Sequence, residues 1–338
     1  MHASLTRHGT HLTPLTLSLS LSLSLSLAMA LSLTACTSSS DPAKDEPAPT
    51  AGGTGATRTV KTAMGDVKVK NAPKRVVVLD TAELDSAITL GVKPVGATRA
   101  GAEHSFLSYL PDSETTGITE VGEISHPNLE KIAALKPDLI LSSKIRDGQR
   151  YQQLSAIAPT VLTESTGYPW KQNFRLHADA LGKTPEAKTA IAKYEAHTKR
   201  VTKALGGKQK AAATDINVVR FVEGADIRIY GKQNYIATIL ADVGLGRPAI
   251  TDKAKDGFSY DVSPEQIDKA DADVIFTSTY GNPNKAKVTQ TTTSGLWRGI
   301  RAVRDDRVFQ VDDELWIQGI GYTAANRILT ELQSDLTT

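Results

Sequence analysis

Segments with a helical pattern alternate with short apolar runs along most of this 338-residue chain. In KRVVVLDTAELDSAITLGVKPVGA, Arg75 to Leu79 form a β-branched run that is typical of a buried parallel strand. The helix that follows has a candidate N-cap at Asp80 or Thr81 and ends at a glycine. The same alternation recurs in PNLEKIAALKPDLILSS and RYQQLSAIAPTVLT. Strands that alternate with helices predict an α/β fold with mainly parallel sheets.

The second half of the chain repeats this plan. We expect strands within residues 217–230, a helix over 235–243, a helix and a strand in VSPEQIDKADADVIFTS, a strand in DDRVFQVDD and a closing helix from about Tyr322. Glu130 and Glu265 are each followed by Ile at +2, Asp at +8 and Ile at +10, which indicates an internal duplication. The matching residues are Ile132, Asp138 and Ile140, and Ile267, Asp273 and Ile275. The sequence therefore predicts two related three-layer lobes.

One long helical segment separates the two halves. Thr184 is a candidate N-cap, Pro185 occupies the first helical position and Gly206-Gly207 ends the segment, which leaves about 21 helical residues or roughly 30 Å. Its apolar residues form one stripe: Ile191, Tyr194, Val201 and Leu205. We expect a helix that lies along both lobes and permits little opening. The predicted boundaries are 59–182 for the first lobe, 183–206 for the helix and 207–338 for the second lobe.

The N-terminal region is expected to lie outside the folded part. Residues 1–35 contain Arg7 and then a long uncharged stretch, and serine at every second position makes this stretch less apolar than a spanning helix, so we interpret it as a signal peptide. Residues 36–58, rich in Ser, Pro, Gly and Ala, are predicted to be a flexible tether. Cys36 is the only cysteine, so no intrachain disulfide can form and it needs another role.

Several function classes are disfavoured by the composition. The net charge of +2 is spread along the chain without a Lys/Arg run, so no nucleic-acid partner is expected. The four histidines after the tether have no metal-ligand spacing: His104, His126, His177 and His197. We find no G-x-S-x-G motif and no compelling Ser/His/Asp set, so an exported hydrolase is the remote alternative. A binding protein without a metal or cofactor of its own is favoured over an enzyme.

The whole arrangement resembles the iron-siderophore and vitamin B12 class of substrate-binding proteins of ABC importers. The resemblance rests on RVVVLDTAELDSAITLGVKPVGA, VGEISHPNLEKIAALKPDLILSSK, IRIYGKQNYIATILADVGLGRPA, VSPEQI and LWRGIRAVRDDRVFQVD. Leu33-Thr34-Ala35-Cys36 also resembles the lipobox of bacterial lipoproteins, which implies lipid attachment at Cys36. Acyl chains on that residue would anchor a soluble domain to the membrane.

The resemblance implies a monomeric receptor on the extracytoplasmic face of a Gram-positive cell membrane. It would bind a ferric siderophore, with the hydroxamate type favoured, and deliver it to an ABC permease that works with a cytoplasmic ATPase. The iron would be held by the siderophore, so no protein ligands to iron are expected. Related hydroxamate binders carry Trp and Arg where this chain has Ile236 and Thr238. A haem or cobalamin receptor of the same fold is the alternative, with Tyr280 or His104 as candidate haem ligands.

Two arginines are the first candidates for ligand contacts. Arg220, Arg228 and Tyr230 alternate with the apolar residues of VVRFVEGADIRIY, and a hairpin centred on Gly224 would place the two arginines directly opposite each other. Opposed cations disfavour pairing unless an anionic group lies between them. A ligand rich in oxygen atoms would satisfy both. The alternative is that Glu223 or Asp226 pairs with them.

Other candidates follow strands of the first lobe or lie in loops. Arg146 follows the strand that ends near Ser142, at the carboxyl edge of the sheet where open α/β folds bind ligands. Arg99 and His104 occupy the equivalent edge after the second strand. Aromatic residues are scarce, so three in predicted loops are candidate ligand contacts: Trp170, Tyr280 and Trp316. Trp297 precedes a helical stretch and is expected in the core.

Glu130 and Glu265 have a different predicted role. In the family that this chain resembles, one exposed glutamate on each lobe docks onto arginines of the permease. These two glutamates occupy the duplicated positions. Each also begins a predicted helix, where a carboxylate is favoured by the helix dipole, and both explanations can hold.

Overall fold

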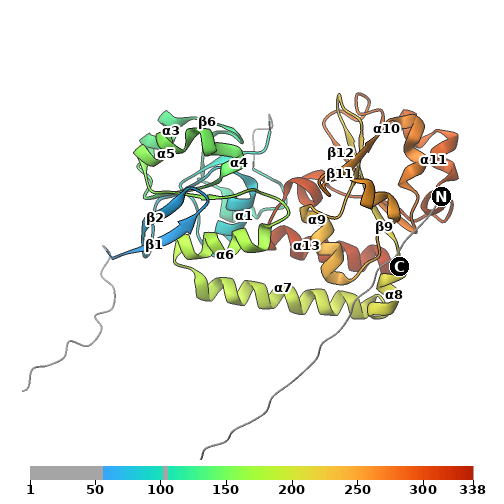
Figure 1. The fold of residues 1–338 in the computed structure, drawn as a ribbon, viewed down its shortest axis with the longest axis horizontal. Coiled ribbons are helices and arrows are strands. Elements are labelled where there is room, and N and C mark those ends of the chain that lie inside the picture. The colour runs from blue at the N-terminus through green and yellow to red at the C-terminus, as the bar shows by residue number, and fades with distance from the viewer. Residues whose placement is uncertain (1–55, 102–105, 338) are drawn as a thin grey trace, which may run out of the picture. The chain divides into compact units, whose positions relative to one another are not determined.

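The computed structural model describes residues 56–101 and 106–337. All of these residues belong to one compact unit. Within it, two α/β lobes are joined by the long helix α7 (Thr184–Ala204), as the sequence predicts (Figure 1). The signal peptide, Cys36, the tether up to residue 55 and His104 lie outside the described residues, so the predictions for them stay untested.

The first lobe contains, among the described residues, a six-stranded sheet in the order β6-β5-β4-β3-β7-β8. Each neighbouring pair is parallel except β5 and β6. A separate hairpin of β1 and β2 starts at Thr57, so the lobe begins slightly before the predicted residue 59. The elements are β1 (Thr57–Thr62), β2 (Gly65–Lys70), β3 (Val76–Val78), α1 (Thr81–Thr89), β4 (Gly96–Arg99), α2 (Asp112–Thr115), β5 (Thr119–Glu123), β6 (His126–Pro127), α3 (Leu129–Ala134), β7 (Leu139–Ser143), α4 (Lys144–Asp147), η1 (Gly148–Arg150), α5 (Tyr151–Ile157), β8 (Thr160–Thr163) and α6 (Trp170–Leu181).

Alternate residues of the β3 segment face opposite sides of this sheet. Val76 and Val78 belong to the apolar cluster that includes α1 and α6, whereas Val77 and Leu79 pack with α3 and α5. A strand that is buried on both faces needs apolar side chains at every position, which explains why this segment is apolar throughout. The two helix layers lie on either side of the sheet, so the predicted three-layer lobe is confirmed (Figure 1).

The second lobe contains, in the described part of the chain, a five-stranded sheet in the order β11-β10-β9-β12-β13. Strands β9, β12 and β13 are parallel, but β10 runs antiparallel to both of its neighbours. The helix predicted within VSPEQIDKADADVIFTS is instead a 3₁₀ helix with non-helical backbone at Gln266. The elements are α8 (Lys208–Ala212), β9 (Ile216–Val222), β10 (Ile227–Tyr230), α9 (Tyr235–Val243), η2 (Ala249–Lys253), β11 (Ser259–Val262), η3 (Pro264–Ala270), β12 (Val274–Tyr280), α10 (Val288–Thr292), α11 (Gly295–Gly299), α12 (Arg301–Arg304), β13 (Val308–Gln310), η4 (Glu314–Gln318) and α13 (Tyr322–Thr337).

The internal duplication is visible in the packing of the two lobes. Ile132 and Ile267 are both fully buried under their sheets. Asp138, just before β7, accepts a hydrogen bond from the backbone N–H of Arg75 at 2.8 Å, just before β3. Asp273, just before β12, accepts one from the backbone N–H of Asp215 at 2.8 Å, just before β9. In each lobe the repeated aspartate therefore joins the starts of two parallel neighbouring strands.

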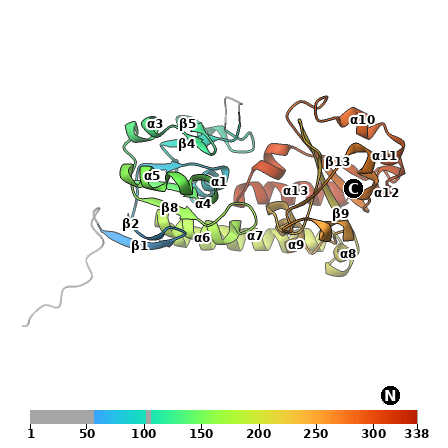
Figure 2. The same ribbon diagram turned by 45° about the horizontal axis from the view of Figure 1, so that its top comes forward.

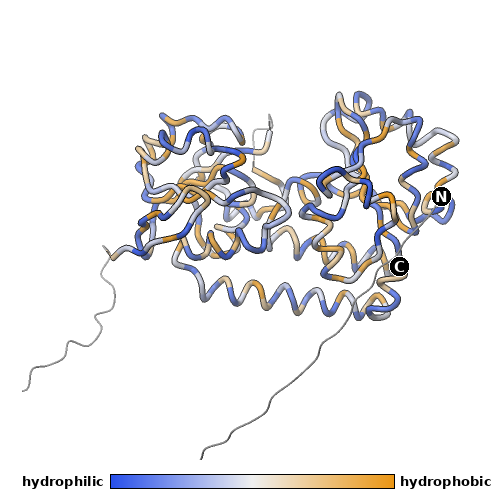
Figure 3. The backbone as a smooth tube through the Cα atoms, viewed as in Figure 1, coloured by the Kyte–Doolittle hydropathy of each residue, from blue (hydrophilic) through white to orange (hydrophobic). Residues whose placement is uncertain are grey.

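The linking helix α7 has the predicted length, with 21 residues. Its N-cap is Lys183 rather than the predicted Thr184, which is the first helical residue. Gly206 and Gly207 follow its end with φ of 88° and 93°, a left-handed backbone that glycine adopts without strain. Hydrophobic positions recur at intervals along an otherwise hydrophilic helix (Figure 3). None of the helices in the described ranges is both long and apolar enough to cross a membrane.

The lobes share more than this helix. One apolar cluster runs through α1, α6, α7, α9 and α13, with members such as Leu84, Phe174, Val201, Leu240 and Ile328 in these five helices. In Figure 2, α6, α7 and α9 follow one another along the lower side of the two lobes. Because one continuous core includes residues of both lobes, separating the lobes would expose apolar surface to water. This shared core supports the expectation of limited opening.

A buried carboxylate adds a polar tie between the lobes. Asp85 of α1 has no exposed surface and accepts hydrogen bonds from the backbone N–H groups of Thr323 and Ala324 at 3.0 Å each. These N–H groups lie in the first turn of α13, where helices leave such donors without intrahelical partners. The side chains of Thr89 and Tyr109 also donate to Asp85 at 3.0 Å. A residue of the first lobe therefore caps a helix of the second.

Candidate functional site

A cavity of about 600 Å³ lies between the two lobes. The first lobe lines it with residues that follow β3, β4, β5, β7 and β8, at the carboxyl ends of its parallel strands. The second lobe lines it with residues from β9, β10 and β12 and from η4. Open α/β sheets bind ligands at the carboxyl ends of their strands, so this cavity is the candidate functional site. Its volume is in the usual range for small-molecule sites, about 300–1,000 Å³.

The predicted arginine pair is confirmed as a geometric feature of the hairpin. Arg220 of β9 and Arg228 of β10 are directly opposed, and both line the cavity. Each is paired with a carboxylate of the protein, as the alternative expects, but the partners are Asp313 and Asp261 rather than Glu223 or Asp226, and Glu223 pairs with Lys285. The opposed cations are therefore offset without a ligand. The partner of Arg228 is Asp261 on β11, at 3.2 Å from Nε and 3.4 Å from Nη2.

The partner of Arg220 is Asp313, which organises several cavity groups. Arg220 donates to its two oxygens from Nε at 2.7 Å and from Nη2 at 2.5 Å. Ser278 of β12 donates to Oδ1 at 2.9 Å, and Gln318 of η4 donates to Oδ2 at 2.9 Å. Asp313 is 9% exposed, so these bonds are little screened by water. Although burial acts to lower it, Asp313 holds the pKa of Arg220 above its usual value.

Two tyrosines complete the second lobe's side of the cavity. Tyr280, 41% exposed, lies beneath the Arg220 guanidinium, whose Cζ is 4.7 Å from the ring centroid. Tyr230 is buried, and burial raises the pKa of its hydroxyl while the guanidinium groups of Arg220 and Arg228 oppose that rise. Its ring packs edge-on against Phe258, another lining residue, at 5.6 Å. The site therefore combines oriented N–H and O–H donors with aromatic surface.

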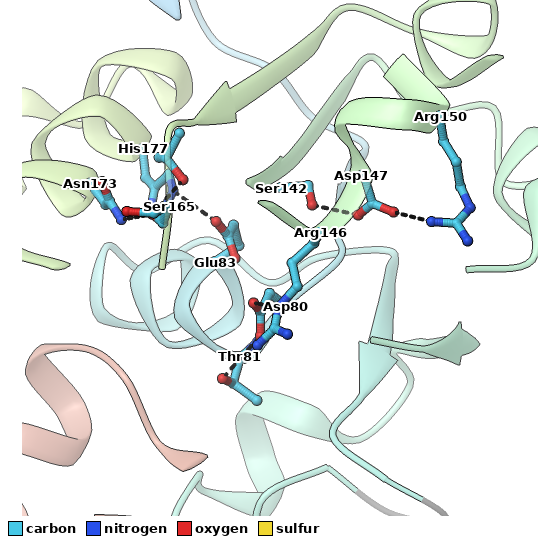
Figure 4. Close-up of polar contacts among 11 residues, drawn as sticks. Asp80, Thr81, Glu83, Ser142, Arg146, Asp147, Arg150, Ser165, Asn173 and His177 are labelled. Atoms are coloured by element: carbon cyan, nitrogen blue, oxygen red, sulfur yellow. Dashed lines mark hydrogen bonds and ion pairs between the residues drawn. The ribbon is translucent and has the colours of Figure 1, made fainter. Parts of the chain in front are cut away.

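The first lobe contributes the predicted Arg146. Its Nε donates to Oδ2 of Asp80 at 2.8 Å, and both residues line the cavity (Figure 4). Asp80 also accepts from the backbone N–H of Thr81 at 2.7 Å and thereby caps α1. Burial, and then the neighbouring Glu83 carboxylate, raise the pKa of Asp80, while Arg146 opposes the rise. Arg146 is thus fixed by a carboxylate that is anchored to a helix start.

Further buried polar groups lie behind Arg146 (Figure 4). Asp147 does not line the cavity; it accepts a hydrogen bond from Ser142 at 2.6 Å and lies 3.4 Å from Arg150. Glu83 lies 3.3 Å from Nε2 of His177, and both side chains are about 1% exposed. Within the ranges that the structure describes, no group of three or more His, Cys, Asp or Glu side chains is arranged to hold a metal ion.

The predictions for the tryptophans need correction. Trp170 does not lie in a loop of the cavity: it begins α6, is 2% exposed and packs against Tyr194, Tyr235 and Tyr322. Its indole N–H donates to Thr238 at 2.7 Å, so it belongs to the core one layer behind the cavity.

The remaining two tryptophans are also buried. Trp316 borders the cavity but has no exposed surface, because it stacks on Phe276 and donates to Glu331. Its ring therefore forms part of the back wall rather than a free ligand contact. Trp297 is in the core, as expected.

Exposed apolar side chains gather at the cavity. Of the five large hydrophobic residues that are exposed in the described ranges, four line it: Ile145, Tyr168, Phe258 and Tyr280. Only Tyr280 was a candidate from the sequence. Ile145 is adjacent to the candidate Arg146, and Tyr168 lies two residues before the candidate Trp170. The sequence therefore identifies these two segments but not the side chains that are exposed there. Exposed apolar surface concentrated in one concave region is a mark of a binding site.

The other predicted residues lie outside the cavity. Arg99 pairs with Glu123 at 2.9 Å and does not line the cavity. Glu130 and Glu265 are exposed, in the first turns of α3 and η3. A hydrogen bond from the side chain of Ser263 lowers the pKa of Glu265. Both glutamates are thus accessible on their separate lobes.

Known proteins match this chain over most of its length. Residues 76–315 match the family model described as periplasmic binding protein. A Bacillus subtilis protein named "Probable siderophore-binding lipoprotein YfiY" is 36% identical over 310 residues, which is 89% of this chain and 92% of that protein. The Fe(3+)-citrate-binding protein YfmC of the same organism is 32% identical and covers 75% of this chain and 77% of its own.

A solved structure has the same fold. Staphylococcus aureus SirA complexed with staphyloferrin B superposes with a TM-score of 0.75 and 33% identity, over 83% of this chain and 98% of that one. Bacillus subtilis FeuA complexed with ferri-bacillibactin superposes with a TM-score of 0.69 and 26% identity, over 83% of this chain and 98% of that one.

Proposed function

Because the chain belongs to the periplasmic binding protein family, which consists of substrate-binding proteins and not enzymes, we propose that it is the ferric-siderophore receptor of an ABC importer. The observation that carries this proposal is the cavity between the lobes, where three arginines and four exposed apolar side chains converge. A ferric siderophore presents both oxygen atoms and apolar linkers, so it matches this mixed lining. The relatives named for siderophore and ferric-citrate binding support the same ligand class.

Within that class, two ligand types are candidates. The hydroxamate type is the expectation from the sequence. A citrate-type complex is the second candidate, because Arg146, Arg220 and Arg228 present guanidinium N–H groups that suit carboxylate oxygens. Thr238 stands where related hydroxamate binders carry arginine. Its hydroxyl oxygen accepts a hydrogen bond from the indole N–H of Trp170. The position that would distinguish a hydroxamate site therefore serves the core in this chain.

Quenching of tryptophan fluorescence tests the ligand class. We would titrate the protein with a ferric hydroxamate, ferric citrate, a ferric catecholate, haem and cobalamin. Saturable quenching by one iron chelate would support the proposal. No response to any iron chelate, together with tight binding of haem or cobalamin, would replace it by the alternative receptor function. Arg220→Ala and Arg228→Ala should weaken binding, whereas Arg304→Ala, an exposed arginine of the same lobe away from the cavity, should not.

The anchoring part of the proposal concerns residues outside the described ranges. Residues 1–35 would be removed as a signal peptide, and Cys36 would carry the lipid that holds the receptor on the outer face of a Gram-positive membrane. Residues that follow would act as the tether. In cells, Cys36→Ala should release the protein into the medium without loss of ligand affinity. Retention of the variant in the membrane fraction would refute the lipid anchor.

Glu130 and Glu265 are proposed to dock the loaded receptor onto the permease. Each is exposed, and they occupy duplicated positions on the two lobes. Replacing both by alanine should lower iron uptake in cells while leaving the affinity for the siderophore unchanged. Glu186→Ala is the matched control, because Glu186 is an exposed first-turn glutamate of α7. If the control lowered uptake equally, the docking role would be rejected.

A further inference from the structure

A second cavity, of about 640 Å³, lies among the helices that join the lobes. It is lined from α6 and α7, from α8 and α9, and by Tyr322 at the start of α13. Within the described part of the chain, no residue lines both this cavity and the one between the lobes. Trp170 separates them, because its ring contacts Tyr235, which lines the first cavity, and Tyr194 and Tyr322, which line the second.

The second cavity has an apolar inner wall, although eight of the fifteen described residues that line it are polar or charged. Ile191, Val243 and the rings of Tyr194 and Tyr322 line it. Val243, Tyr194 and Tyr322 are each at most 3% exposed, so they form a fixed surface rather than a mobile rim. An apolar wall of this size accepts the hydrocarbon part of a ligand.

Tyr322 brings a hydroxyl to this wall that has no protein partner. The neighbouring tyrosines are satisfied: Tyr194 donates to Asp242 at 2.6 Å, and Tyr235 donates to the carbonyl of Gly321 at 2.7 Å. The Tyr322 hydroxyl forms no hydrogen bond with any group in the described ranges, and although the residue as a whole is only 2% exposed, its hydroxyl oxygen is not fully enclosed and can be reached by water or by a ligand. Burial raises its pKa to about 12, with the Arg175 guanidinium opposing the rise, so the hydroxyl remains a donor at neutral pH.

The charges around the cavity leave an excess of cations. Lys171 pairs with Asp242, which also accepts from Tyr194. Arg175, Lys199 and Lys208 line the cavity and have no carboxylate within salt-bridge distance in the described ranges. Glu195 is the remaining lining anion. An anionic ligand would therefore be attracted to the side of the cavity where Arg175 approaches Tyr322.

We propose that this cavity is a second binding site, for a long-chain carboxylate. The hydrocarbon chain would lie on Ile191, Val243 and the tyrosine rings. The carboxylate would accept hydrogen bonds from Arg175 and from the Tyr322 hydroxyl. This site does not depend on the proposed siderophore function, because it uses none of the residues that line the cavity between the lobes.

Calorimetric titration of the purified chain with palmitate, below its micelle concentration, tests the proposal. We expect saturable binding of one molecule. Arg175→Gln should weaken it about tenfold or more, because a bond between two charged groups is lost, and Tyr322→Phe also by about tenfold, because a hydrogen bond to the charged carboxylate is lost. Arg304→Gln, at an exposed position away from both cavities, should change affinity less than twofold.

Three comparisons make the outcome decisive. Dodecylamine, which has the opposite charge, should not bind, and a phospholipid should not displace palmitate. A saturating siderophore should leave one palmitate bound, so failure of siderophore binding and failure of this site are separate results. The proposal is overturned if palmitate does not bind, if dodecylamine binds equally, or if neither variant weakens binding. Tyr322→Phe removes one oxygen only, and its unfolding temperature shows whether the fold is intact.

Discussion

Asp313→Asn is the substitution that most directly tests how the cavity between the lobes is organised. Asp313 accepts four hydrogen bonds: two from Arg220, one from Ser278 and one from Gln318. Asparagine has nearly the same size but one acceptor oxygen and an NH₂ group. At most half of these bonds can remain, and the charge that orients the Arg220 guanidinium is lost.

The expected magnitude follows from the freedom that Arg220 gains. In the native protein its side chain is held before the ligand arrives, with only 12% of it exposed. Once released, it must be ordered again on binding, which costs about 1–2 kcal/mol for a long flexible side chain. That corresponds to a loss of affinity of about 5- to 30-fold. Asp261→Asn is the matched control: its bonds to Arg228 are longer and Asp261 is 41% exposed, so we expect less than about threefold.

A double-mutant cycle measured by the fluorescence titration separates this role from a general loss of structure. If Asp313 acts through Arg220, then adding Asp313→Asn to the Arg220→Gln variant should change the dissociation constant less than about twofold. An equal loss in both backgrounds would show that Asp313 supports the cavity independently of Arg220. Unchanged affinity of the single variant would refute the reasoning altogether. Unfolding temperatures of all four proteins verify that each is folded.

Other predictions concern the tie between the lobes and the response to pH. Asp85→Ala should lower the free energy of unfolding by about 2–4 kcal/mol, because it removes the acceptor of the Tyr109 hydroxyl and of the backbone N–H groups of Thr323 and Ala324. Asp226→Ala, at an exposed position, should stay within about 0.5 kcal/mol; urea denaturation measures both. A loss below 1 kcal/mol for Asp85→Ala would contradict the capping role. Because the pKa of Asp80 is raised, it should become protonated at a higher pH than an ordinary aspartate as the pH falls, and Arg146 then loses its partner. The native protein should therefore lose its higher affinity relative to Arg146→Gln as the pH falls. The measurement is the ratio of the two dissociation constants at each pH, in which any titration of the ligand cancels. A constant ratio from neutral to acidic pH would contradict this prediction.

The parts of the fold that sequence could predict are those governed by local pattern. Three features reflect a periodicity or a backbone constraint. They are the buried apolar run before Asp80, the two glycines after α7, and the equal spacings that follow Glu130 and Glu265. The opposed arginines belong here too, because an antiparallel hairpin fixes which residues face each other once its centre is known. In each case the relevant residues lie within a few turns or strands of one another.

The contacts that could not be predicted join distant parts of the chain. The sequence shows Arg220, but nothing local connects it with Asp313, 93 residues away. Trp170 was misplaced because the helix that it begins has few strongly apolar positions, although Pro169 before it and Gly182, with φ of 71° after it, are boundary signals that could have been used. The shared core beneath the lobes likewise depends on how five helices pack, which no single segment specifies.

The pairing of each arginine bears on how the receptor would select its ligand. Arg146 is held by Asp80 of the same lobe, and Arg220 and Arg228 are held by carboxylates of theirs. Each lobe therefore presents its donors as a fixed set, independent of the other lobe. The distance between the two sets then depends on the shared core and on polar ties between the lobes, such as those of Asp85 and the bond from the Ser108 backbone N–H to Glu314, rather than on the paired arginines. It follows that a conservative substitution in this core, such as Leu240→Val, should alter the ranking of siderophores of different sizes even though no ligand-lining residue has changed. A uniform loss of affinity for every ligand, with the same ranking, would show that spacing is set within the cavity itself.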